Sequence, residues 1–126
     1  MLVLDSGGLS LLAKRTQKSA AMIAALRDEG QWPPLVPTVV LIESLHGNAG
    51  RDANTNRFLK ACLIDQAVPT PLARRAARLR KLAGKGSAVD AIVVALAEPN
   101  GTVMTADRDD IEALAAHADR VDVVAI

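Results

Sequence analysis

Short apolar runs alternate with longer amphipathic stretches along this chain. Residues 1–4 are all apolar, and Asp5 and a serine–glycine–glycine turn follow them. An apolar run this short that ends at a turn predicts a buried strand of a parallel sheet. Further short strands are expected at 35–36, 66–70, 102–104 and 121–126.

Helical periodicity occupies the segments between these strands. The spacing of leucine and alanine predicts one helix over 9–27, then helices over 38–47 and 52–64. In the helix over 38–47, Val39, Ile42 and Leu45 are expected to face the core. A fourth helix carries the stripe Leu72, Ala76, Leu79 and Ala83 and ends at the 84–86 turn. The last two helices are expected over 88–97 and 107–117.

The alternation of strands and helices predicts an α/β fold with a small, mainly parallel β-sheet flanked by α-helices. With 126 residues, the chain fits one domain over 1–126. Half of the residues are apolar, but Trp32 and Phe58 are the only aromatic ones. The core is therefore expected to consist of leucine, valine, isoleucine and alanine.

Charge and cysteine content exclude several classes of protein. The net charge of +1 gives no general argument for nucleic-acid binding, so any such argument must come from the distribution of charge. Cys62 is the only cysteine, which excludes an intrachain disulfide and suggests a reduced environment. No apolar run reaches the roughly 18–20 residues of a membrane span, and the N-terminus lacks signal-peptide features. We expect a cytoplasmic protein.

Four carboxylates are candidates for chemistry, and each also has an ordinary structural explanation. Asp5 could be a turn residue after the first strand, and Glu43 could lie on the exposed side of its helix. Asp90 forms a capping-box pattern with Ser87. Asp107 could cap the helix that follows it, and Asp109 and Asp110 could both be first-turn acids that favour the helix dipole.

The combination of these acids is more informative than any one of them. The carboxyl ends of parallel strands meet at one edge of a sheet, so the four carboxylates are expected to converge. Converging carboxylates raise one another's pKa unless a cation offsets their charge. Oxygen ligands select Mg²⁺ or Mn²⁺, which activate water and stabilise displacement at phosphorus. The sequence offers no histidine partner for Ser6, no Cys/His cluster and no phosphate-binding glycine motif.

The order of these segments resembles PIN-domain ribonucleases, and more narrowly the VapC toxins of bacterial toxin–antitoxin pairs, along the whole chain. The segment ESLHG at 43–47 is similar to the family's Glu-Leu-x-x-Gly-like segment, with Ser44 where leucine is usual. The segment SAVDA at 87–91 resembles its helix start of small residues followed by Asp-Ala. Thr105-Ala106-Asp107, followed by Asp110, resembles its Thr-x-Asp segment and later acid.

This resemblance implies a three-layer α/β/α fold and an Mg²⁺- or Mn²⁺-dependent endoribonuclease that a cognate antitoxin silences, usually as a homodimer. Asp5, Glu43, Asp90 and Asp107 would carry the metal, and Thr105 could orient an acid or a bound water. The family often has a hydroxyl or amide residue two positions after the first aspartate, where this chain has Gly7. Ser6 could supply that hydroxyl instead.

Basic residues concentrate in the fourth predicted helix. Arg74, Arg78, Lys81 and Lys85 are spaced to share one face, opposite the apolar stripe. This face could be merely solvated, could follow RNA phosphates, or could bind an acidic antitoxin segment.

Two other functions compete with the nuclease. The first is a catalytically inactive PIN-like module that acts only by binding protein or RNA. The second is a small phosphohydrolase with a strand-end aspartate nucleophile, which would need a second aspartate where this chain has Gly7.

Overall fold

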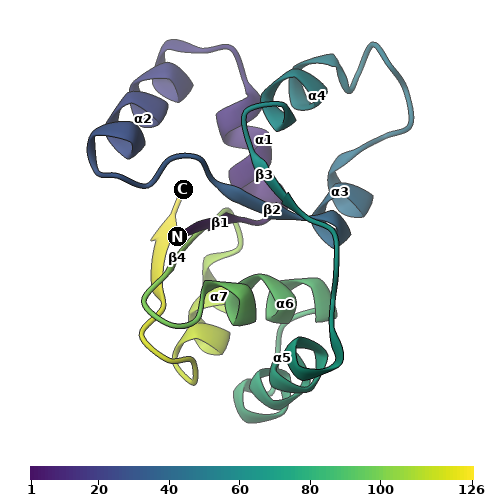
Figure 1. Ribbon diagram of the computed structural model, residues 1–126, viewed down its shortest axis with the longest axis vertical. Helices are drawn as coiled ribbons and strands as arrows, with labels where there is room; N and C mark the ends of the chain where they lie inside the picture. Colours follow the sequence, from purple (N-terminus) through teal and green to yellow (C-terminus); the bar gives the residue numbers. More distant parts are fainter.

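The computed structural model describes residues 1–126 and contains a five-stranded sheet in the order β3-β2-β1-β4-β5 (Figure 1). All four neighbouring strand pairs are parallel. The strands are β1 (Leu2–Leu4), β2 (Leu35–Pro37), β3 (Leu63–Asp65), β4 (Thr102–Thr105) and β5 (Asp122–Ala125). The predicted parallel sheet is confirmed, and the opening strand is its central strand.

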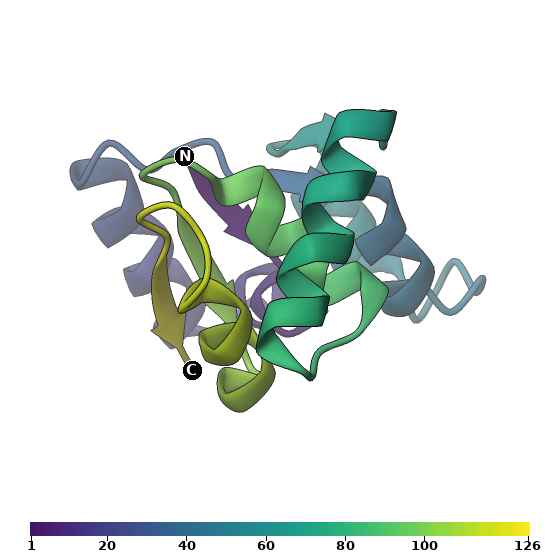
Figure 2. The ribbon, with the colours of Figure 1, turned by 90° about the horizontal axis from the view of Figure 1, so that it is seen from below.

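Seven helices cover the two faces of the sheet. Helices α1 (Ser6–Ala13), α2 (Gln17–Asp28), α3 (Thr38–Ser44) and α4 (Ala53–Leu59) lie on one face (Figure 1). Helices α5 (Thr70–Ala83), α6 (Ala88–Ala97) and α7 (Arg108–Ala115) lie on the other, and Figure 2 views the molecule from their side. This arrangement is the expected three-layer α/β/α fold. None of the helices combines the length and the hydrophobicity that crossing a membrane requires.

The core lies on both sides of β1 and β4. It comprises 19 buried residues, and all of them are aliphatic except Met104, as the composition predicted. Helix α6 packs on β1 with Ala91, Val93 and Val94 fully buried, and α1 packs on the other face with Leu9 and Leu12. Full burial of a side chain such as Leu or Val contributes about 1.5–3 kcal/mol, so this core holds the strand ends firmly in place.

The topology places the carboxyl ends of β1 and β4 side by side. The chain runs from β1 to β2 and β3 on one side, then returns across β1 to β4 and β5 on the other. In open α/β sheets such a switch point forms a crevice that binds ligands. Leu4 pairs with Met104, so the next residues, Asp5 and Thr105, emerge next to each other.

The prediction of one helix over 9–27 is wrong, because the chain forms α1 and α2 with a break between them. Lys14 adopts an extended backbone after α1, and Thr16 then caps α2 by accepting the Ser19 N–H at 3.1 Å. The Ser19 hydroxyl in turn donates to the Leu11 carbonyl at 2.6 Å, which fixes the turn between the helices. A local cap therefore prevails over the continuous helical periodicity.

Two predicted helices are also shorter than expected. Helix α4 ends at Leu59 rather than Ile64, and the third strand is 63–65 rather than 66–70. The Leu63 N–H donates to Pro34 O at 2.9 Å, so pairing with β2 draws this segment into the sheet. Helix α3 ends at Ser44 rather than Gly47 and buries Val40. Ile42, which was expected to face the core, is 80 % exposed.

Candidate active site

A cleft of about 400 Å³ opens beyond the carboxyl ends of β1 and β4. Helices α3 and α6 and the loop between β4 and α7 form its other walls. The cleft contains all four predicted acids, together with two of the supporting residues named from the sequence. Its lining comprises Asp5, Ser6, Gly7, Glu43, Ser87, Asp90, Ala106, Asp107 and Asp110.

Asp5 is buried at the end of β1 and caps helix α1. Its Oδ1 accepts the Gly8 N–H at 2.8 Å, so the turn role expected of this residue is present. Its Oδ2 accepts a hydrogen bond from the hydroxyl of Thr105, which is fully buried at the end of β4. The Thr105 hydroxyl oxygen also accepts the Asp107 N–H at 2.8 Å. One hydroxyl thus connects Asp5 to the loop that carries Asp107.

The pKa values of two cleft acids are shifted upward. Burial raises the pKa of Asp5, hydrogen bonds from Thr105 and Gly8 partly offset this effect, and the negative charge of Asp90 adds to it. The pKa of Glu43 is raised by loss of hydration and then by the charges of Asp90 and Asp5. The ionised carboxylates therefore repel one another, as expected for a site suited to a cation.

Asp90 has both a structural contact and a free oxygen. The Asp90 N–H donates to Ser87 Oγ at 3.0 Å, and Asp90 Oδ2 accepts the Ser87 N–H at 3.1 Å. The capping box predicted for this helix is therefore present. The box uses only one carboxylate oxygen, and Asp90 Oδ1 makes no hydrogen bond within the protein.

Asp107 stands at the N-cap position of α7, but its side chain makes no capping hydrogen bond. The ordinary explanation of this residue as a helix cap therefore does not hold. Asp90, Asp107 and Asp110 can each contribute one oxygen to a group whose members all lie within 4.8 Å of one another. This oxygen-only donor set fits a hard divalent cation.

The two acids that follow Asp107 in α7 differ in position. Asp110 lines the cleft and forms an ion pair with Lys85 Nζ at 3.4 Å. Asp109 is exposed and does not line the cleft. The sequence names both as first-turn acids, and only the tertiary structure distinguishes them.

Gly7 marks the departure from the family pattern, and the packing around it gives a physical reason. A Cβ atom at Gly7 would collide with the Ala106 side chain and would lie 2.8 Å from the Ala106 backbone nitrogen. Helix α1 approaches the β4–α7 loop too closely here for any side chain. Ser6 lines the cleft beside Gly7, and its hydroxyl makes no hydrogen bond within the protein.

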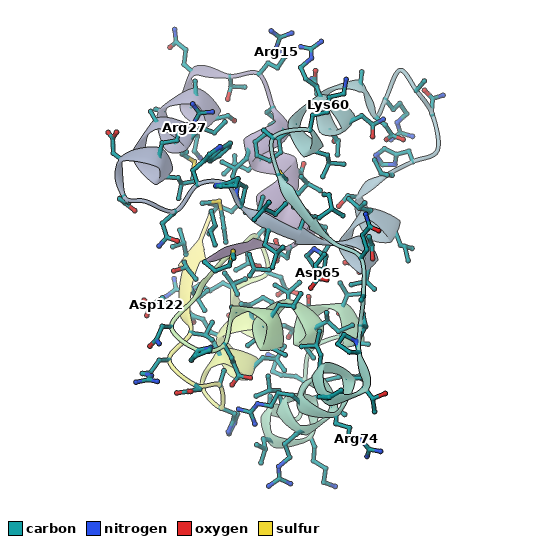
Figure 3. All side chains as sticks on the ribbon, in the orientation of Figure 1. Arg15, Arg27, Lys60, Asp65, Arg74 and Asp122 are labelled. Carbon is teal, nitrogen blue, oxygen red and sulfur yellow. The ribbon has the colours of Figure 1, made fainter.

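The basic residues expected on one helix face are not all on that face. Helix α5 ends at Ala83, and Gly84 adopts a left-handed conformation with φ 69°, so Lys85 lies beyond the helix. The prediction of a shared face is therefore wrong for Lys85, which instead reaches Asp110. Arg74, Arg78 and Lys81 are exposed and do not line the acidic cleft, and Arg74 extends from the outer side of α5 (Figure 3).

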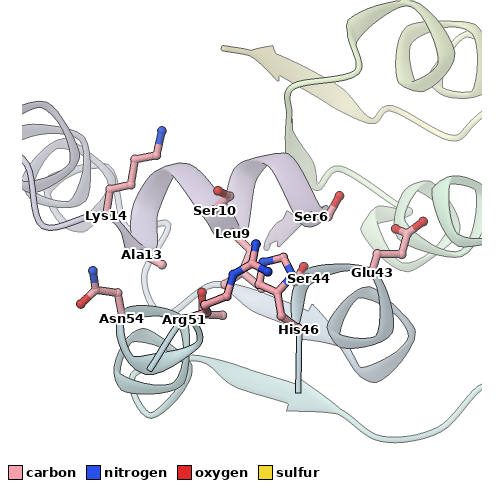
Figure 4. Close-up of a pocket in the computed structure, with 11 residues that line it drawn as sticks. Ser6, Leu9, Ser10, Ala13, Lys14, Glu43, Ser44, His46, Arg51 and Asn54 are labelled. Carbon is pink, nitrogen blue, oxygen red and sulfur yellow. The ribbon is translucent and has the colours of Figure 1, made fainter. Parts of the chain in front are cut away.

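A second pocket of about 330 Å³ adjoins the cleft, between α1, α3 and the segment 46–55 (Figure 4). Ser6 and Glu43 line both spaces. Lys14, His46 and Arg51 contribute basic side chains to the second pocket. The sequence does not point to these three residues as a group, because Lys14 and Arg51 belong to no motif and His46 lies in the 43–47 segment at a position to which that motif gives no role.

Two further carboxylates that the sequence analysis did not single out have structural roles. The buried Asp52 carboxylate accepts backbone N–H groups from His46, Gly47 and Asn48 at 2.9–3.2 Å, and these bonds lower its pKa. Glu98 binds the Arg75 guanidinium through two hydrogen bonds of 2.8 and 2.6 Å, and this contact lowers the pKa of Glu98.

No protein-family model and no curated protein matches the sequence. Among solved structures, the fold is similar to that in the crystal structure of FitAcB from Neisseria gonorrhoeae, with a TM-score of 0.60. The similarity covers 98 % of this chain and 96 % of that chain at 18 % sequence identity. At this identity the likeness establishes a shared fold, and that fold is the three-layer α/β/α arrangement described above.

Proposed function

We propose that this protein is a metal-dependent endoribonuclease that hydrolyses RNA phosphodiester bonds and acts as the toxin of a toxin–antitoxin pair. The observation that carries the proposal is the convergence of Asp5, Glu43, Asp90 and Asp107 in one cleft at the switch point of the sheet. Acids that converge in a cleft, two of them, Asp5 and Glu43, with raised pKa values, are characteristic of functional sites. The PIN-like fold and the order of the sequence motifs support the same conclusion.

Asp5, Asp90, Asp107 and Glu43 would hold Mg²⁺ or Mn²⁺. A divalent ion supplies Lewis-acid activation of water and neutralises charge that develops on phosphoryl oxygens. Thr105 positions the Asp5 carboxylate through its hydroxyl, and the Ser87 cap positions Asp90. Asp110 adds a carboxylate to those of Asp90 and Asp107, within 4.8 Å, whereas Asp5 and Glu43 line the same cleft outside this close group. The contact of Asp110 with Lys85 limits the negative charge at that side of the cleft.

The proposal extends to the partners that the motif resemblance implies, a cognate antitoxin and a second copy of the chain in a homodimer, in the cytoplasm. The exposed basic residues Arg74, Arg78 and Lys81 are available to RNA or to an acidic antitoxin segment. The competing function, a PIN-like module without catalysis, shares the fold but does not require the free carboxylates of Asp90 and Asp107.

The decisive experiment compares wild-type protein with Asp90→Asn on total cellular RNA in the presence of Mn²⁺ and of EDTA. Asparagine can still accept the Ser87 N–H, so the cap and the fold should persist, and circular dichroism checks this. We expect metal-dependent cleavage by the wild type and a loss of more than about 100-fold in Asp90→Asn, since even outer-shell partners of metal sites cost about 10–100-fold. Absence of Mn²⁺ binding and of RNA cleavage in the wild type would exclude the nuclease.

A further inference from the structure

The pocket beside the acidic cleft differs from it in charge. It contains one lysine, Lys14 on the α1–α2 connection, and one arginine, Arg51 before α4. Neither side chain forms an ion pair. In Figure 4, Glu43 and Ser6 lie at one end of the pocket and Lys14 at the other, with Arg51 between them. A surface that is negative at one end thus becomes positive over the length of one small pocket.

The polar side chains of this pocket are unengaged within the protein. The hydroxyls of Ser6, Ser10 and Ser44, which all line the pocket, make no hydrogen bond to another protein group. Ser44 Oγ is the one buried side-chain polar atom of the chain without a hydrogen-bond partner. A buried hydroxyl without a partner costs about 1–3 kcal/mol, which a ligand that accepts its hydrogen bond would recover.

The loop that carries His46 and Arg51 is held in place by hydrogen bonds from its own side chains to its backbone. Asp52 accepts the N–H groups of residues 46–48, and Asn48 Oδ1 accepts the N–H groups of Gly50 and Arg51 at 3.0 and 3.1 Å. His46 and Arg51 therefore extend from a backbone that is already ordered. Such preorganisation reduces the entropy cost of binding a ligand.

We propose that this pocket binds the backbone phosphate next to the scissile phosphodiester of a single RNA strand. The inference rests on the proposed function, because it places the reacting phosphate at the acidic cleft and the neighbouring phosphate at Lys14 and Arg51. The Ser44 hydroxyl donates to the same phosphate. The pocket directs one end of the RNA strand along α1 and α4 and defines the orientation in which the strand crosses the cleft.

The chemistry of the pocket favours a phosphate over a base or an apolar group. None of its 11 lining residues is Phe, Tyr or Trp, and only two are hydrophobic, so His46 is the single ring in the pocket on which a base could stack. Cations together with hydroxyl donors are the groups that contact nucleic-acid phosphates. Because Ser6 and Glu43 belong to both spaces, a strand bound at the acids continues directly into the pocket.

The test measures binding of a fluorescent single-stranded RNA of mixed sequence to Lys14→Ala/Arg51→Ala and to Ser44→Ala. All variants carry Asp90→Asn, so binding is measured without cleavage. The matched control is Lys18→Ala/Lys60→Ala, which removes the same charge from exposed positions that line no described pocket. We expect the pocket variant to lose about tenfold or more in affinity, with a salt dependence reduced by about 0.7 for each lost phosphate contact.

The Ser44→Ala variant and a competition experiment provide further tests of the pocket. Ser44→Ala should weaken RNA binding several-fold without lowering thermal stability, because its hydroxyl has no partner to lose in the free protein. Equal losses in the pocket and control variants, or no loss in either, would overturn the proposal. It would also be overturned if a polyglutamate peptide displaced the RNA as effectively as unlabelled RNA does, since the pocket would then serve an acidic protein segment. A binding loss in the pocket variant stands even if the cleavage experiment above shows no nuclease.

Discussion

The acids of the cleft and the two structural acids, Asp52 and Glu98, have opposite surroundings. Asp52 and Glu98 each receive several hydrogen bonds from donors fixed in place, and their pKa values are lowered. In the cleft, Asp107 has no side-chain hydrogen bond as a cap, and Asp5 and Glu43 have raised pKa values. The same functional group is thus stabilised in its charged form in one region and destabilised in the other.

This difference separates acids that maintain the fold from acids that are free for chemistry. A protein can satisfy a buried carboxylate with backbone N–H groups, as it does at Asp52. In the cleft, Asp5 and Asp90 also cap helices, but Asp90, Asp107 and Asp110 bring their carboxylates within 4.8 Å of one another. Holding several carboxylates this close together costs stability and is retained mainly where a ligand or a reaction uses them. Substitutions in the two groups should therefore dissociate activity from stability.

The largest expected effect contrasts two aspartates of the same segment. Asp107→Asn should reduce RNA cleavage by more than about 100-fold and weaken Mn²⁺ binding, because the variant loses a metal ligand. Asp109→Asn, at an exposed position outside the cleft, should stay within about twofold of the wild type. Cleavage assays and calorimetric Mn²⁺ titrations measure both. A similar loss in the two variants would mean that overall charge, rather than the cleft geometry, governs activity.

An intermediate effect, on stability rather than on activity, is expected for the structural acid Glu98. Glu98→Gln removes the ionic partner of Arg75, and because the Arg75 side chain is 39 % exposed, we expect a loss of about 1 kcal/mol and a Tm lowered by about 2–6 °C. RNA cleavage at low temperature should be retained. Glu112→Gln, which breaks the exposed pair with Arg108, is the control and should change stability by less than about 0.5 kcal/mol.

The pH dependence of the Glu98 effect follows from its lowered pKa. Its contribution to stability is present above the ordinary value of 4.5 and is lost as the pH falls through the lowered pKa of the folded state. The stability difference between wild type and Glu98→Gln should therefore be largest at neutral pH and vanish in acid. Denaturant unfolding from pH 3 to pH 7 measures this difference, and a constant difference would contradict the assignment.

The smallest effect on stability should come from Glu43, with the opposite sign of pH dependence. Its raised pKa means that it favours the folded state below 4.5 and that this advantage is lost as the pH rises through the raised pKa. Glu43→Gln should accordingly equal or slightly exceed the wild type in stability at neutral pH, by less than about 0.5 kcal/mol, in metal-free buffer. A clear loss of stability would place Glu43 among the structural acids.

Local signals in the sequence were sufficient to predict those strands and helices whose formation depends mainly on their own residues. The apolar run of β1, the strand 102–104 and the helix over 88–97 with its Ser87–Asp90 cap are all confirmed. These signals did not predict the structure of segments where a contact with another part of the chain, or a helix cap, overrides the periodicity. The segment 63–65 has helical spacing but pairs with β2, and the continuous periodicity over 9–27 is interrupted by the Thr16 cap.

The sequence alone predicted an α/β fold with a mainly parallel sheet and the convergence of four carboxylates at its edge, because strand ends and helix starts are local features and alternating strands and helices favour a parallel sheet. Only the tertiary structure decided that Asp110 lines the cleft and Asp109 does not, that Lys85 meets Asp110, and that a basic pocket adjoins the acids. These facts depend on distances between segments remote in the chain. Packing of the core sets those distances, and residue periodicity does not encode them.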